Sequence, residues 1–380
     1  MKFIKTPDLK RGMKLAKPIY NRDGVMLYER GSLLTEQGIV SINNFGLIGV
    51  YILEPQEPVP PMSRDDIEFE RFQAMSIFSI RDILDEIKNE KEPSGLYQFA
   101  NKIIKEFGML DRKINFIQSL RSISDYIYKH SLNTAILSAM MSHFMKLSFK
   151  EQLDVVIAAL VHDAGSLNVP LPVRRKPEDR LTEDDKNTIQ AAHMKFFSTI
   201  SDQFEMDPEV KNILRSLLYS IHGIRTASDT SIVVNHDAVE VVRVAACYDE
   251  MTAMKLDEEP MSEIAAIRFL MDEKNGYAQN VVAALTGSIN LLKPALMVEL
   301  TNGEKGLIID GNDQDILSPK VLSFSTNEVY DLADAIVSRG IGIKDIVKTL
   351  DNRFVINTYL LDTYRGKTVH IGEKLDKSTF

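Results

Sequence analysis

The sequence has little of several features that mark whole classes of protein. It contains one cysteine, Cys247, and no tryptophan among 380 residues, which excludes an intrachain disulfide framework and favours a reducing compartment, the cytoplasm. It has no excess of positive charge. The formal net charge is -9 and the isoelectric point is about 5.4, which argues against general binding to nucleic acid or to anionic membranes.

Long apolar runs are also missing. No stretch of about 20 residues is free of charge, and the start, Met1 to Lys5 (MKFIK), leads directly into polar sequence, so we expect neither export nor a membrane span. What remains is ordinary globular composition, 44% hydrophobic and 26% charged. That composition and length suit two or three domains with one large core.

The two ends of the chain have β-type patterns. Residues 1–55 carry short apolar runs and turn residues, as at Lys17–Gly24, and predict a small N-terminal β-rich module. The proline-rich residues 56–63 predict a stiff linker. Within residues 293–380, the runs on both sides of Thr301-Asn302-Gly303 predict a hairpin in a small C-terminal β module, and 326–350 predict one or two helices.

Residues 64–292 repeat apolar positions at helical spacing and predict a helical bundle. Thr182 is expected to cap a helix over about 183–205, Asp207-Pro208 to begin the next, and Ser262 to cap a later one. The predicted fold is therefore mainly α, with a β module at each end.

A histidine-aspartate pair, His162-Asp163, ends the apolar run Val155–Val161. Buried ionisable groups need a partner, which is either a hydrogen-bonding neighbour or a metal ion. His130 and His193 also lie on apolar stripes of predicted helices, and facing helices of a bundle can bring such ligands together. These four residues form a nitrogen and oxygen ligand set suited to one divalent ion of iron, manganese or zinc. The sequence leaves open whether such an ion is bound.

Longer motifs surround these residues. Asp125–Asn133 (DYIYKHSLN) places His130 in a helix-opening motif, His162–Pro170 (HDAGSLNVP) stands where HD-GYP proteins have HDIGKIGIP, and Lys176 to His193 follows their KPGKLT…H segment. Lys10–Ala16 and Leu300–Glu304 are similar to β modules often placed before and after that domain. Over nearly its whole length the chain thus resembles HD-GYP domain proteins of bacterial cyclic-di-GMP signalling, a branch of the HD metallophosphohydrolases. The resemblance implies an HD-type bundle and a phosphodiesterase-like metal site.

Several family positions are altered. Counted without gaps from Tyr248–Thr252, which matches the family's FDALT, a ligand aspartate falls on Ala246. The same count places the paired histidines of the HHE motif on Leu217 and Leu218, its glutamate on Tyr219, and the GYP triplet on residues 225–227. Ser166 replaces a lysine after the HD pair. These changes predict a degenerate site that lacks the ligands for two ions.

Other polar residues near the motifs have two interpretations each. His222 and His236 could replace the lost histidines, but Gly223 suggests a helix end with a surface His222. Asp249 is expected to be a hydrogen-bonding partner rather than a ligand. Arg174, Arg175 and Lys176 either contact substrate phosphates or lie in solvent. Arg225 and Lys255 are a weaker suggestion for nucleotide contacts.

Two functional classes follow. The favoured class is a non-catalytic regulator that binds a cyclic dinucleotide or a signalling protein partner. The alternative is a metal-dependent phosphohydrolase, acting on cyclic di-GMP or another phosphate ester, in which Asp163 is the residue tied to catalysis. A third idea is that the β modules recruit the partner. The sequence leaves the oligomeric state open.

Overall fold

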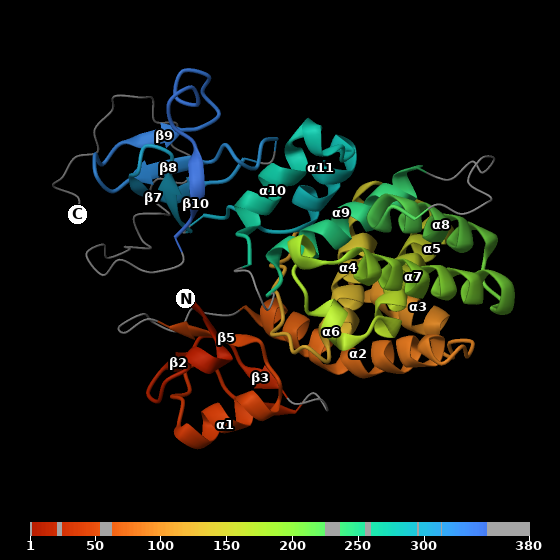
Figure 1. The fold of residues 1–380 in the computed structure, drawn as a ribbon. Helices are drawn as coiled ribbons and strands as arrows, with labels where there is room; N and C mark the ends of the chain where they lie inside the picture. The colour runs from red at the N-terminus through yellow and green to blue at the C-terminus, as the bar shows by residue number, and fades with distance from the viewer. Residues whose placement is uncertain are drawn as a thin grey trace.

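A computed structural model describes residues 2–20, 25–53, 63–224, 236–254, 260–294, 296–312 and 314–347. The predicted turn at 21–24, nearly all of the predicted linker, the triplet 225–227, Lys255 and residues 348–380 lie outside these ranges. Within them the chain forms a helical domain with a small β-containing region at each end (Figure 1). None of the described helices is long and apolar enough to cross a bilayer.

The N-terminal module joins strands to one helix. Antiparallel strands pair in the order β1 (Lys2–Lys5), β5 (Gly49–Leu53) and β2 (Lys14–Leu15), while β3 (Ile19–Tyr20) pairs with β4 (Met26–Tyr28). A short 3-10 helix (Thr6–Asp8) follows β1. Helix α1 (Glu36–Asn44) begins at Thr35, whose side chain accepts a hydrogen bond from the Gly38 amide. Leu15, Ile42 and Val50 are fully buried in its core.

The helical domain is arranged around α4 (Tyr126–Phe144), which packs on α5 (Phe149–Val161), α9 (His236–Thr252) and α11 (Gln279–Ser288). Helix α5 is buried throughout its last seven residues, which explains their unbroken apolar sequence. The other helices are α2 (Arg64–Lys88), α3 (Leu96–Phe107), α6 (Leu171–Arg174), α7 (Glu183–Gln203), α8 (Pro208–His222) and α10 (Glu263–Met271), with 3-10 turns at Ala164–Asn168, Glu178–Arg180 and Glu273–Asn275. The predicted mainly α fold is confirmed.

Helix ends follow the predicted capping chemistry. The side chains of Thr182, Asp207 and Ser262 each accept a hydrogen bond from a first-turn amide of α7, α8 and α10. Gly223 ends α8 in the left-handed conformation, with φ of 68°, which favours glycine because it has no Cβ.

The C-terminal region contains one antiparallel sheet in the order β10-β6-β7-β8-β9. The predicted hairpin is confirmed as β6 (Met297–Leu300) and β7 (Lys305–Asp310), joined by a turn in which Gly303 has a φ of 83°. Strands β8 (Lys320–Ser323), β9 (Val329–Asp331) and β10 (Ile343–Ile346) complete it. The prediction of helices over 326–350 is wrong for described residues 326–347, because β9 and β10 bury apolar residues that the sequence pattern assigned to a helix.

The N-terminal module contacts the segment that leads into α4. The Ile48 amide donates to the Arg121 carbonyl at 3.0 Å, and Lys17 Nζ donates to the Gln118 carbonyl at 2.8 Å. Leu120 and Met254 of the helical domain are buried in the core of the module. The segment 117–122 is therefore held from the module side as well as from the helical side.

Candidate metal centre

The HD pair lies where α5 stops. His162 is the last α-helical residue in its backbone geometry, and Asp163 begins the 3-10 turn Ala164–Asn168. That turn packs closely on α7: a Cβ built on Gly165 would lie 2.6 Å from His193 Nδ1 and 3.0 Å from its Cα. Only glycine permits this approach, and the approach brings His193 to Asp163.

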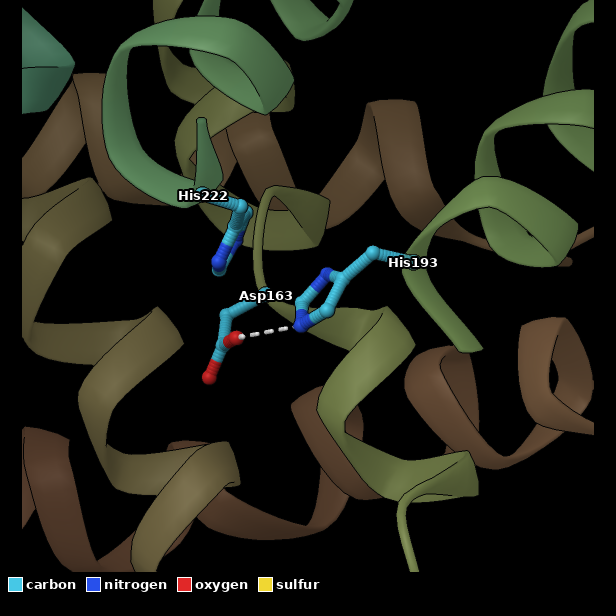
Figure 2. A group of neighbouring side chains, drawn as sticks. All are labelled: Asp163, His193 and His222. Carbon is cyan, nitrogen blue, oxygen red and sulfur yellow. Dashed lines mark ion pairs between the residues drawn. The ribbon is translucent and has the colours of Figure 1, made fainter. Parts of the chain in front are cut away.

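Asp163, His193 and His222 form one cluster, in which one ligand atom from each lies within 4.8 Å of the others. Figure 2 shows the three side chains directed toward one another from three different segments. Asp163 Oδ1 lies 4.0 Å from His193 Nε2, and the His193 and His222 ring centroids are 3.7 Å apart. Ser166 Oγ donates to Asp163 Oδ1 at 2.6 Å and lies 3.2 Å from His193 Nε2.

Two buried nitrogens of this cluster have no hydrogen-bond partner among the described residues: His193 Nδ1 and His222 Nε2. A buried polar atom without a partner costs about 1–3 kcal/mol, so His222 Nε2 calls for a ligand. His193 Nδ1 lies against Gly165, and the His193 nitrogen beside Asp163 is Nε2. Two imidazoles and a carboxylate are a donor set that zinc, iron and manganese accept. The residues therefore fit one divalent ion.

His130 and His162 form a second histidine pair. His162 Nδ1 donates to the Ala159 carbonyl at 2.8 Å, and His130 Nδ1 lies 2.7 Å from Asp249 Oδ2. Both acceptors are oxygens without a proton, so each Nδ1 carries the hydrogen. Each Nε2 is then directed toward the other ring. The two Nε2 atoms are 3.3 Å apart. Two nitrogens at zinc-ligand distance in a tetrahedral site lie about 3.3 Å apart as well.

Asp249 closes this side of the site and is completely buried. Its Oδ1 and Oδ2 each lie 2.6 Å from Arg121 Nη2, and Oδ1 also accepts from Asn133 at 2.8 Å and Gln118 at 3.0 Å. Burial opposes ionisation of Asp249, but the attraction of Arg121 outweighs it and holds the pKa well below the usual range. The predicted role of Asp249 as a hydrogen-bonding partner matches these contacts.

The histidine pKa values are shifted in opposite directions. Burial alone would lower the pKa of His130, but the hydrogen bond that its Nδ1 donates to Asp249 reverses this and raises the pKa. Burial, with the nearby His130, lowers the pKa of His162 to about 4. Burial, with the nearby His193, lowers the pKa of His222 to about 3. His162 and His222 are thus neutral at pH 7, which is the form that binds a metal.

Burial of the Asp163 carboxylate would raise its pKa, but the surrounding histidines, His193 first, lower it. A neighbouring cavity of about 450 Å³ is lined by Asp163, Ser166, Tyr126 and Glu250. Arg174, Arg175 and Lys176 line the same cavity, and Lys176 Nζ pairs with Asp185 at 2.6 Å. The basic run thus lies beside Asp163 rather than on a remote face.

The structure changes the interpretation of His222. We expected a surface histidine at the end of α8, but its ring is half-buried and contacts His193. Leu217 and Leu218 are buried in the main core, as their apolar stripe predicts, and Ala246 is buried as well. His236 is exposed at the start of α9.

Comparisons with known proteins found one family model, one curated relative and one solved structure to report. The family model of the HD domain matches residues 127–274. A cyclic di-GMP phosphodiesterase of Pseudomonas aeruginosa is 20% identical over 224 residues, which are 58% of this chain and 53% of that protein. The chain thus matches about half the length of this relative. Bd1817, an HDG"Y"P protein from Bdellovibrio bacteriovorus, has 15% identity and a TM-score of 0.44, over 75% of this chain and 97% of that one.

Proposed function

We propose, since residues 127–274 match the family model of the HD domain, that the chain binds one divalent metal ion and a phosphate ester of the cyclic dinucleotide type, as a regulator that does not turn its ligand over. Asp163, His193 and His222 would hold the ion. Arg174 and Arg175, on the wall of the cavity beside Asp163, would bind the phosphate. Such an ion supplies electrostatic attraction for phosphate oxygens when bound.

The observation that carries this proposal is the cluster of Asp163, His193 and His222, in which His222 Nε2 is buried without a partner among the described residues and Asp163 lines a cavity with basic residues. The absence of hydrolysis is argued from Ala246 and Ser166. Alanine has no donor atom for a second ion, and the Ser166 hydroxyl already bridges Asp163 and His193 without adding a positive charge. Hydrolysis by two ions needs about three or four ligands for each ion.

A metal-dependent phosphohydrolase is the second candidate, favoured by the geometry of His130 and His162. Their Nε2 atoms face each other at 3.3 Å, with each Nδ1 fixed by an oxygen acceptor. Fixing one ring nitrogen so that the other can bind is how proteins orient metal-ligating histidines. With Asp163 close to both histidine pairs, a reduced but working centre would use Asp163 as the shared carboxylate.

The test measures metal content, ligand binding and turnover on the same preparations. Elemental analysis of protein purified without chelator should give about one ion per chain, and His222→Ala should lose it. The matched control is His143→Ala, a partly exposed histidine on α4 that pairs with Asp111 outside the cluster. Calorimetry should show that cyclic di-GMP binds the metal-loaded protein and that Arg174→Ala weakens this binding.

Three results separate the candidates. Binding without release of the linear dinucleotide supports the regulator. Release that disappears in both His222→Ala and His162→Ala establishes the phosphohydrolase instead. Full metal content in His222→Ala, or no metal in the unmodified chain, overturns the proposed centre.

A further inference from the structure

A second cavity, of about 390 Å³, lies between the N-terminal module and the helical domain, away from the HD pair. One stripe of α2, from Glu70 through Gln73, Ala74 and Ile77 to Arg81, forms one wall. The eleven steps along the helix from Glu70 to Arg81 span roughly 16 Å, so the cavity is elongated. The facing wall combines Ile19, Phe45 and Leu47 of the module with the segment 117–122.

The two ends of this cavity differ in charge. At one end the Arg81 guanidinium lies 4.9 Å from the Tyr128 ring centroid, and no described carboxylate pairs with it. Of the acids near it, Asp125 of the lining already accepts from Lys129 at 2.8 Å and from the Ser122 amide at 2.6 Å. Asp85, one turn after Arg81 on α2, accepts from the Tyr128 hydroxyl. An arginine without a carboxylate at the end of a cavity is a site for an anionic group.

At the other end a carboxylate lies among cations. Glu70 is half-buried, and Lys17 and Arg30 are the cations whose charges act on it, while burial raises its pKa. Between the two ends the lining is largely apolar, with Ile19, Ile77 and Leu132. An occupant that fits has an apolar body and one anionic group, and it lies along α2 with that group at Arg81.

The wall of this cavity also belongs to the hydrogen-bond network around Asp249. The Gln73 side chain donates to Asn133 at 2.9 Å, and the Gln118 side chain donates to Asp249 at 3.0 Å and to Thr252 at 2.9 Å. Asp249 in turn holds His130 at 2.7 Å. Two hydrogen bonds therefore separate the cavity wall from the His130 ring.

We propose that this cavity is an effector site for an elongated amphipathic anion, and that Gln118 transmits its occupancy to His130. The effector site goes beyond the proposed function and does not depend on it, since the cavity shares no lining residue with the metal cluster. The shared element is Gln118, whose backbone carbonyl is also held by Lys17 of the N-terminal module. An occupant that moves the module or α2 changes the position of Gln118.

Binding is tested with 8-anilinonaphthalene-1-sulfonate, a fluorescent anion with an apolar body, on the full chain. We expect saturable binding at one site per chain. Ala74→Trp fills the cavity and should abolish binding, whereas Met75→Trp, at an exposed neighbouring position on α2, should retain it. Arg81→Gln should weaken binding about tenfold or more, the effect of losing a charge-assisted hydrogen bond. N-phenyl-1-naphthylamine has the same apolar body without the sulfonate. Its affinities for the unmodified chain and for Arg81→Gln should agree within about twofold.

Coupling is tested by NMR of ¹⁵N-labelled histidine in the metal-free protein, so failure of the metal centre does not affect the result. Saturating probe should shift the His130 ring signals and leave those of His143 unchanged. In Gln118→Met the probe should still bind but no longer shift His130. Circular dichroism and melting curves show whether each variant is folded. If Ala74→Trp does not fold, Arg81→Gln tests the site in its place.

Equal binding by the unmodified chain and folded Ala74→Trp would overturn the effector site, as would equal loss of sulfonate and neutral probe affinity in Arg81→Gln. Absence of saturable binding to the unmodified chain has the same meaning. A His130 shift that persists in Gln118→Met would overturn the proposed transmission.

Discussion

The two polar clusters inside the helical domain differ in how completely the protein satisfies them. Around Asp249, a buried carboxylate is bound by Arg121, His130, Asn133 and Gln118. Around Asp163, the one hydrogen bond to the carboxylate comes from Ser166 among the described residues, and His222 Nε2 is buried there without a partner. The Asp249 carboxylate is thus satisfied by several protein donors. The Asp163 cluster leaves a buried histidine nitrogen for a ligand, because unpaired buried donors and acceptors are costly.

The difference teaches which cluster is structural and which is open to a ligand. Asp249 and Arg121 are both completely buried, so each compensates the charge of the other. The remaining N–H groups of Arg121 have no hydrogen-bond partner, although its guanidinium lies 4.8 Å from the Tyr126 ring centroid. Asp163 lies at the edge of a cavity instead. Four experiments can break or sharpen this comparison.

The largest effect is expected from Arg121→Met. It leaves the Asp249 carboxylate buried without its cation, which costs about 3–5 kcal/mol of unfolding free energy. Urea unfolding measures the loss. The control is Lys186→Met, which breaks an exposed pair with Glu183 at 2.9 Å and should change stability by less than about 1 kcal/mol. Equal losses would mean that the Asp249 cluster is not structural.

Acid should destabilise the metal-free protein through His162. Its pKa is lowered to about 4 in the folded chain from a usual 6.5, so the unfolded chain binds a proton that the folded chain does not. The unfolding free energy is therefore unaffected by His162 above pH 6.5, and it falls by roughly 3 kcal/mol as the pH falls toward 4. His130, whose pKa is raised, has the opposite effect: its contribution to the unfolding free energy is lost as the pH rises above 6.5.

Urea unfolding at a series of pH values, with chelator present, measures this dependence. His162→Phe should flatten the slope between pH 4 and 6.5. His143→Ala should keep the slope of the unmodified chain. An unchanged slope in His162→Phe would show that another group is responsible.

Metal should stabilise the Asp163 cluster and not the Asp249 cluster. Zinc or manganese at about 100 times its dissociation constant should raise the unfolding free energy by about 2.7 kcal/mol. His222→Ala should remove most of this gain. If the gain survives in His222→Ala and disappears in His130→Ala, the ion is held by the other histidine pair.

The smallest effect is expected from Ala246→Asp, which returns a carboxylate to the position that the family count assigns to a ligand. Ala246 is buried, so the metal-free variant should be less stable by about 1–3 kcal/mol. Added metal should reverse this loss, and elemental analysis should rise toward two ions per chain. A metal content that stays at one ion per chain would show that residue 246 does not contribute to the metal centre.

Local chemistry made much of the fold predictable. Thr182, Asp207 and Ser262 cap the helices that the sequence assigns to them, because a cap depends only on the next three residues. The hairpin around Gly303 follows from its turn residues. The helices expected over 326–350 failed because short apolar runs suit a helix or a strand, and the neighbouring strands of a sheet decide between them.

The site was less predictable than the fold. His130, His162, Asp163 and His193 were selected from apolar stripes and motifs, and the structure brings them to one region of the domain. His222 was considered as a replacement for the lost histidines but was expected at the surface, because the glycine after it indicated a helix end. Arg121 was missed, because a charged residue in a connecting segment gives no sign that it is completely buried.

The sequence by itself determined where several helices begin, where the hairpin turns, and which side chains could serve as ligands, because those properties depend on neighbouring residues. Only the tertiary structure decided which ligands meet. Asp163, His193 and His222 come from the end of α5, from α7 and from the end of α8. Their distances are set by how those elements pack, and periodicity within each element carries no information about that packing.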